Sequence, residues 1–234
     1  KNAQNLGAWL DSVRPGLHNG AMKKHVYKRF IAVRDDFYSD PLAVYRAAQQ
    51  AEYYEPEGYT GFHSRKVYHE PGIRRRIEQL IGVKITRWDT DPHECNGVFY
   101  QGFARGERKE TPGVHSDTPF EDITLVIYLT PGLPPDCGTS LWQHKRTGLT
   151  EPPTAADARR LQCKLAELRE ELERDSKQPA RWIETDRIGY RSNRMVAYPS
   201  GLLHSATNHH GGSMKDGRLF QTFRIGVDWS TFRG

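Results

Sequence analysis

Two histidines and one aspartate have the spacing of a metal-binding set. His115 and Asp117 are separated by one residue, just ahead of the apolar run 122–130. In an extended chain, residues i and i+2 project to the same side, so an imidazole and a carboxylate can reach one ion. The third ligand must come from another segment. His204 is the strongest candidate because it follows the strand-like run 193–199 and a turn.

This ligand set suits a metal that keeps open coordination positions. Two imidazoles and one carboxylate on one face leave three positions free, as in non-haem iron(II) centres. Zinc accepts the same ligands, so the residue types alone leave the metal open. His209 and His210 are rivals for the third ligand, but they lie in a loop rich in glycine and serine, which favours His204.

Arg218 is the candidate residue for binding an anion. It opens the strand-like run 218–227 near the end of the chain. A buried guanidinium is costly unless it is paired, and its planar fork matches a carboxylate. In a regular strand Arg224 lies on the same face and could contact a second carboxylate of a ligand. A surface salt bridge would explain Arg224 equally well.

The N-terminal part of the sequence predicts an arm, a strand and two helices. Residues 1–25 are rich in Gly, Asn and Lys, which indicates a partly flexible arm. We expect a strand within 26–37. A helix then begins at Pro41, after a capping residue, and a second helix spans about 71–80 before Gly82.

From residue 83 onward the pattern changes to short β-type runs, which is typical of a β-sandwich or jelly roll. One helical segment interrupts them. Thr154 can cap a helix that runs to about Asp175, within an insertion of about 152–178. This helix could cover the barrel, act as a lid, or pair with its copy in a homodimer. The β-type runs are 83–88, 96–104, 122–130, 139–144, 193–199 and 218–227.

The motif residues and their order resemble the iron(II)/2-oxoglutarate-dependent dioxygenase superfamily. In that superfamily, an HxD motif begins one core strand, a distal His follows near the end, and an Arg or Lys lies on the next strand. The resemblance extends less specifically over most of residues 30–229. It implies an α+β fold with a double-stranded β-helix (jelly roll, cupin-like) core, N-terminal flanking helices and an inserted helix. One dioxygenase domain would then span 26–234.

The resemblance also implies cofactors and roles for individual residues. His115, Asp117 and His204 would hold Fe(II), Arg218 would bind the distal carboxylate of the cosubstrate 2-oxoglutarate, and O2 would take a remaining position. Gln101 belongs to a run that resembles a strand lining the cosubstrate pocket, so we expect it to contact the cosubstrate. Asn96 and Tyr100 are candidates in the same run, and Trp142 and Phe120 are candidates for the pocket wall.

The reaction implied is oxidation of a C–H bond, with release of succinate and CO2. Halogenases of the superfamily usually replace the motif carboxylate by a small residue, so Asp117 favours hydroxylation. We expect a small-molecule or amino-acid-like substrate.

Other functions remain open from sequence alone. A cupin-like metal enzyme, or a metal-binding module, would need no 2-oxoglutarate. A nucleic-acid dealkylase resembling AlkB is suggested by the spacing of Arg218, Thr222 and Arg224. However, Phe220 replaces the Asn of those enzymes, and we find no concentrated basic and aromatic segment for gripping nucleic acid.

The overall composition indicates what surface, cellular location and cysteine chemistry to expect. The formal charge of +5 comes from basic residues interleaved with acidic ones, as on an ordinary polar surface. The sequence has no apolar stretch of about 20 residues and no signal-peptide order, so we expect a cytoplasmic protein without a membrane span. Its three cysteines are odd in number and widely separated, so we expect free thiols.

Overall fold

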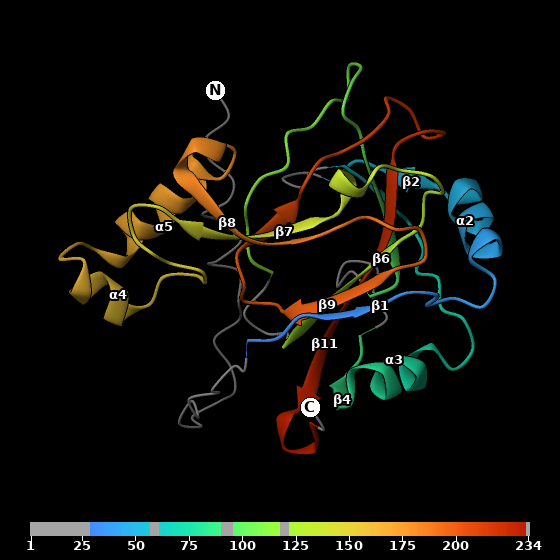
Figure 1. Cartoon of the computed structure of the whole chain (residues 1–234), viewed down its shortest axis with the longest axis horizontal. Coiled ribbons are helices and arrows are strands. Elements are labelled where there is room, and N and C mark those ends of the chain that lie inside the picture. Colours follow the sequence, from blue (N-terminus) through green and yellow to red (C-terminus); the bar gives the residue numbers. More distant parts are fainter. Residues whose placement is uncertain (1–28, 57–60, 90–95, 118–121, 233–234) are drawn as a thin grey trace.

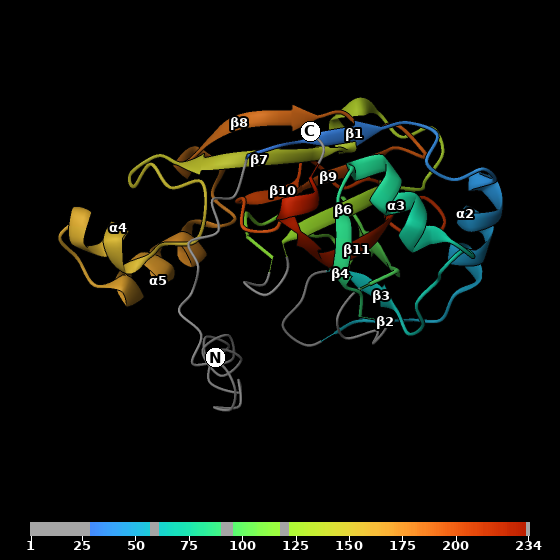
Figure 2. The ribbon, with the colours of Figure 1, turned by 90° about the horizontal axis from the view of Figure 1, so that it is seen from below.

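Two antiparallel β-sheets dominate the protein in the computed structural model, which describes residues 29–56, 61–89, 96–117 and 122–232. Helices lie at the two ends of these sheets (Figures 1 and 2). The architecture is therefore mixed, with both helices and sheets, and mostly antiparallel. The arm predicted over residues 1–25 falls outside the described residues.

The larger sheet has eight strands in the order β1-β9-β6-β11-β5-β3-β2, with β4 also pairing with β11. Its longest strand, β11, lies between β6 and β5. All six residues of β6 are buried, as the apolar run there predicts. The strands are β1 Ala32–Arg34, β2 Tyr53–Tyr54, β3 Phe62–Ser64, β4 Lys84–Arg87, β5 Val98–Gly102, β6 Ile123–Tyr128, β9 Met195–Pro199 and β11 Arg218–Asp228.

The smaller sheet has three strands in the order β10-β7-β8. They are β7 Thr139–His144, β8 Trp182–Ile188 and β10 His204–Ala206. An isolated antiparallel bridge joins His115 to His204, so the segment carrying His115 extends this sheet beyond β10. Figure 2 shows β7 and β8 forming a layer above β9, β6 and β11.

Helices α2 and α3 pack against the outer face of the larger sheet. α2 (Pro41–Gln50) begins after Asp40, whose side chain accepts a hydrogen bond from the backbone of the first turn. α3 (Ile73–Ile81) ends at Gly82, which adopts the left-handed conformation that glycine tolerates best. Both predicted helix boundaries are therefore close to the observed ones. In the described part of the chain, short 3-10 helices span Pro135–Cys137, Pro179–Arg181 and Trp229–Thr231.

Strand alternation in β11 separates the apolar core from a polar interior. Leu219, Phe223 and Ile225 are fully buried in the cluster that α2 and α3 cover. Each such side chain stabilises the fold by about 2 kcal/mol through burial alone. Arg218 and Arg224 project from the opposite face, toward the smaller sheet. The fold thus separates its main hydrophobic core from the side on which chemistry is possible.

The helical insertion consists of two helices, which corrects the expectation of one continuous helix over 154–175. α4 (Ala155–Arg160) and α5 (Leu165–Asp175) lie at the opposite end of the molecule from α2 and α3 (Figure 1). Gln162 has a φ of +54°, and the backbone of Cys163 donates to the carbonyl of Ala158. These features form a Schellman-type ending, which terminates α4 although no Gly or Pro is present.

Other elements also differ from the sequence expectations. Strands β2, β3, β8 and β10 were not predicted, and within the described residues 29–37 of the strand predicted over 26–37, only β1 forms a strand. Cys137 and Cys163 are free thiols, as expected, whereas Cys95 lies outside the described residues. Within the described residues, no helix has both the length and the apolar character needed to cross a bilayer.

Candidate metal centre and cavity

The backbone brings the two candidate histidine ligands side by side. The amide of His115 donates to the carbonyl of His204 over 2.9 Å, and the amide of His204 donates to the carbonyl of His115 over 2.8 Å. The centroids of their rings lie 4.4 Å apart. Residues 89 positions apart in sequence are therefore neighbours because an antiparallel bridge pairs them directly.

Both imidazoles are oriented by the same kind of contact. Nδ1 of His115 lies 2.9 Å from the carbonyl of Gly113, and Nδ1 of His204 lies 2.7 Å from the carbonyl of Leu202. A carbonyl oxygen can only accept, so Nδ1 is the donor in each ring, and Nε2 is the nitrogen that faces a metal. Burial, together with the neighbouring His115, lowers the pKa of His204 to about 4, so this ring is neutral at pH 7.

Asp117 completes the group and is almost fully buried. Its Oδ2 accepts a hydrogen bond from Thr124 and lies 3.6 Å from Nε2 of His204, while its Oδ1 lies 2.7 Å from Nη2 of Arg224. Burial alone would raise the pKa of Asp117. The positive charge of Arg224, with smaller effects from the two histidines and Thr124, outweighs burial and lowers that pKa to about 2.

These three side chains form a donor set for one metal ion. One ligand atom from each of His115, Asp117 and His204 lies within 4.8 Å of the others. Two imidazole nitrogens and an ionised carboxylate suit non-haem iron(II) with open positions, and zinc accepts them too. Hydrogen bonds from both imidazoles to carbonyls are the outer contacts expected around such a metal.

The donor set opens into a cavity of about 760 Å³. The cavity is bounded on one side by β11 and on another by α5, where Leu172 and the following C-cap residue Ser176 contribute to its wall. Strand β5 contributes Tyr100, which stacks on Phe220 with ring centroids 5.2 Å apart. A volume of this size accommodates a small organic molecule beside the metal ligands.

Arg218 lies in the same cavity and is 2% exposed. Its Nε donates to the carbonyl of Cys137 over 2.6 Å, and its Nη2 donates to that of Gly138 over 3.1 Å. The guanidinium also lies over the ring of Phe220, 4.4 Å from its centroid. Among the described residues, no carboxylate forms an ion pair with Arg218. A buried charge held by neutral partners favours an anionic ligand.

Arg224 and Gln101 have contacts that the sequence did not indicate. Arg224 lines the cavity but pairs with Asp117, so its charge supports the candidate metal ligand. Gln101 is in register with Leu219, and its amide nitrogen donates to the carbonyl of Met214 over 2.8 Å. Alternation along β5 places Tyr100 and Gln101 on opposite faces, but Gln101 is still among the residues that line the cavity. The expected contact of either residue with a cosubstrate stays a prediction.

The other residues singled out from the sequence have different surroundings. His209 lines the cavity, but its Nε2 lies 3.6 Å from Glu110. The histidine that joins His115 and Asp117 is His204. Asn96 is fully buried, and its side-chain oxygen accepts from the backbone of Arg224. Trp142 packs in an apolar cluster beside the cavity, and Phe120 lies outside the described residues.

Thr124 is the site residue that the sequence analysis missed. It is buried, donates to Asp117, and lies 2.9 Å from Oγ of Ser200. The signal was present, since Thr124 is a polar residue inside the apolar run 122–130. Ser200 also accepts the amide of Asp117 through its carbonyl, at 3.0 Å, so the loop after β9 helps to hold the carboxylate.

A family model matches residues 108–221, which include the candidate metal ligands and Arg218. Its description is a family of unknown function (DUF6445). No curated protein matches the chain.

Two solved structures are similar to the chain at low sequence identity. AviO1 from Streptomyces viridochromogenes Tue57 has 14% identity, with 89% of this chain and 93% of that chain covered, and a TM-score of 0.42. A prolyl-4-hydroxylase from Pseudomonas putida has 12% identity, with 88% and 95% covered, and a TM-score of 0.33. Likeness at this level carries no inference about the activity of the present chain.

Proposed function

We propose that this protein is an iron(II)- and 2-oxoglutarate-dependent oxygenase that hydroxylates a small-molecule or amino-acid-like substrate. The observation that carries the proposal is the combination of two features in one cavity. His115, Asp117 and His204 offer three ligand atoms within 4.8 Å of one another. Arg218 supplies a buried guanidinium in the same cavity, and within the described residues it contacts backbone carbonyls and the rings of Tyr128 and Phe220 but no carboxylate.

The separation of Arg218 from the metal ligands is consistent with a short dicarboxylate. His204 pairs with Leu141 of β7, whereas the guanidinium of Arg218 donates to Cys137 and Gly138, just before that strand begins. Three residues of extended chain span about 10 Å. A ligand that bridges this distance and pairs with Arg218 would carry a carboxylate at the end away from the metal.

The proposal includes a double-stranded β-helix for the core. The strand order β9-β6-β11-β5 in one sheet faces β10-β7-β8 in the other, and the bridge from His115 to His204 adds an eighth segment. Chain connections that alternate between the two sheets are the pattern of a jelly roll. This arrangement supports the resemblance noted from the motif residues.

In this proposal the residues of the chain would bind the metal, orient the cosubstrate and shield the cavity from water. Both imidazoles present Nε2 because a carbonyl holds each Nδ1 proton. Thr124 and Arg224 hold the two oxygens of Asp117, which fixes the carboxylate in its ionised form. Arg218 would orient the cosubstrate through its distal carboxylate. Tyr100 and Phe220 would exclude water from the cavity wall.

When bound, Fe(II) and 2-oxoglutarate would supply oxidation of a substrate C–H bond by O2, with conversion of the cosubstrate to succinate and CO2. The site residues contribute no redox chemistry of their own. Their task is to keep three metal positions open for the cosubstrate and O2, and to leave the rest of the cavity for the substrate.

Succinate release tests this function. Purified protein with Fe(II), O2 and 2-oxoglutarate should form succinate, and the His204→Ala variant should form none. Arg218→Ala should raise the KM for 2-oxoglutarate about tenfold or more, because a charge-assisted contact contributes about 1.5–3 kcal/mol. Arg187→Ala, which removes an exposed guanidinium on β8, is the matched control and should leave the KM unchanged.

Absence of succinate from iron-loaded wild-type protein, with any substrate offered, would refute the cosubstrate assignment. A cupin-like metal enzyme that uses no 2-oxoglutarate would then be favoured. An unchanged KM in Arg218→Ala would instead show that this arginine does not bind the cosubstrate.

A further inference from the structure

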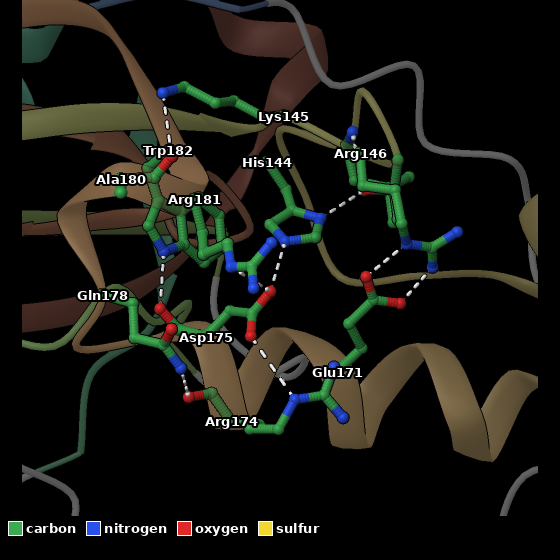
Figure 3. Close-up of polar contacts among 12 residues, drawn as sticks. His144, Lys145, Arg146, Glu171, Arg174, Asp175, Gln178, Ala180, Arg181 and Trp182 are labelled. Atoms are coloured by element: carbon green, nitrogen blue, oxygen red, sulfur yellow. Dashed lines mark hydrogen bonds and ion pairs between the residues drawn. The ribbon is translucent and has the colours of Figure 1, made fainter.

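A second cluster of possible metal ligands lies where the helical insertion meets β7. His144, Glu171 and Asp175 each have a ligand atom within 4.8 Å of the others. Figure 3 shows that guanidinium groups surround the two carboxylates. Arg146 makes two contacts with Glu171, and Arg174 lies 3.4 Å from Asp175.

The charges in this cluster argue against a metal ion. Nε of Arg181 lies 3.9 Å from Asp175, so three guanidiniums face two carboxylates. A divalent cation would have to displace these positive groups and would meet a site that is already compensated. The cluster is better explained as a joint between the end of α5 and the end of β7.

His144 and Asp175 form the buried centre of this joint. Their side chains are 1% and 6% exposed, and Nε2 of His144 lies 3.1 Å from Oδ2 of Asp175. Nδ1 of His144 contacts the hydroxyl of Thr147 at 2.9 Å. The carbonyl of Asp175 also accepts from Nε1 of Trp182 over 2.8 Å, so β8 is tied to the same residue (Figure 3).

The residue after Asp175 connects the joint to the candidate metal centre. The carbonyl of Ser176 accepts a hydrogen bond from the amide of Val114 over 2.9 Å. The residue before Val114 is Gly113, and its carbonyl orients Nδ1 of His115. A Cβ at position 113 would lie 3.5 Å from the side chain of Lys177, so this segment runs in close contact with the end of α5.

Apolar packing links the same elements. Val114 and Leu203, the residues directly before His115 and His204, belong to one buried cluster with Leu172 of α5 and Trp182 of β8. The insertion therefore contacts the chain immediately beside both candidate histidine ligands. A shift of α5 would be transmitted to those ligands because close-packed side chains cannot absorb it without repacking.

We infer that His144 and Asp175 are positioning residues for the metal site. By fixing the last turn of α5, the pair holds Ser176 against Val114, and this contact keeps Gly113 in place to orient His115. The inference rests on the proposed function, because it assigns the insertion a role at the same metal centre. It predicts that metal binding depends on two side chains that make no contact with the metal ligands.

The test measures Co(II) binding to metal-free, full-length protein by visible absorption. In the double variant His144→Leu/Asp175→Leu neither polar partner remains buried alone, so the fold should persist. We expect its Co(II) affinity to fall about tenfold, as for other outer-sphere partners of metal ligands, with an altered absorption spectrum. Val114→Pro, which removes the amide that donates to Ser176, should reproduce both changes without altering the pair itself.

Arg146→Gln is the matched control, because it removes another tie between α5 and the β7 turn. Its Co(II) affinity and spectrum should equal those of the wild type. Wild-type affinity and spectrum in the double variant would overturn the positioning role while leaving the metal site intact, whatever the result for Val114→Pro. Failure of the wild-type protein itself to bind Co(II) would overturn the proposed function and this inference together.

Discussion

Among its described residues, the protein has two groups of histidine and carboxylate side chains whose geometry alone would admit a metal ion. In both groups, three ligand atoms lie within 4.8 Å of one another. At His115, Asp117 and His204, both rings turn Nε2 toward a cavity, and one guanidinium pairs with the carboxylate. At His144, Glu171 and Asp175, three guanidiniums occupy the carboxylates.

This difference shows that proximity of ligand atoms is a weak criterion for a metal site. The first group keeps lone pairs directed at one point and has space beside it. The second group has already satisfied its charges and hydrogen bonds within the protein. The two groups therefore make opposite predictions for metal binding, although α5 and its neighbours connect them.

The largest expected effect is loss of metal binding in His204→Ala. The wild type should bind one Fe(II) or Co(II) per chain, and this variant should bind none, because two ligands cannot hold the ion in competition with water. Isothermal titration with Co(II) measures the number of ions that each of the two proteins binds. Glu171→Gln, a change in the second group, should retain one ion per chain. A loss of stoichiometry in Glu171→Gln would mean that the second group holds the metal.

A smaller effect is expected on the stability of the protein when the second group is disrupted. His144→Leu removes the imidazole that contacts buried Asp175, which should lower the free energy of unfolding by about 2 kcal/mol. Urea denaturation of the metal-free protein measures this change. An unchanged midpoint would show that Arg174 and Arg181 satisfy Asp175 without the histidine.

Thr124→Val should weaken metal binding without removing it. The substitution keeps the shape of the side chain but deletes the hydroxyl that donates to Asp117. We expect Co(II) affinity to fall about tenfold. Thr185→Val, on the exposed side of β8, is the control and should bind Co(II) as the wild type does. Equal affinity in both variants would exclude a role for Thr124.

The smallest effect is expected for Arg146→Gln. Its pair with Glu171 is close, but the arginine side chain is 53% exposed. Such exposed pairs contribute about 1 kcal/mol or less to stability, because water and salt screen them. Thermal unfolding at low and high salt measures this contribution. A destabilisation as large as that of His144→Leu would remove the contrast between the buried and exposed halves of the second group.

Much of the fold follows from local patterns in the sequence. The helix that begins at Pro41, the helix that ends at Gly82 and the apolar strand β6 are marked by capping residues, a left-handed glycine and continuous hydrophobicity. β8 was missed because its middle residues alternate between partly buried and exposed polar side chains. β10 has three residues, too few to show a period. Both strands are stabilised by pairing with β7.

The site was predictable only as far as residue types and order allow. The HxD spacing and the strand preceding His204 brought three side chains to notice, and the structure brings these three together. The pairing of Arg224 with Asp117 joins residues 107 positions apart, and no local pattern encodes it. The second group was missed for the same reason, since His144 and Asp175 meet only when the insertion folds back on β7.

The most direct measurement is anaerobic titration of the Fe(II)-loaded protein with 2-oxoglutarate, followed by visible absorption. We expect a weak metal-to-ligand charge-transfer band that saturates with the cosubstrate in the wild type. Arg218→Ala should require about tenfold more 2-oxoglutarate or higher to reach the same band. If iron is bound but no band forms at any concentration, 2-oxoglutarate does not chelate the metal, and the oxygenase assignment is wrong.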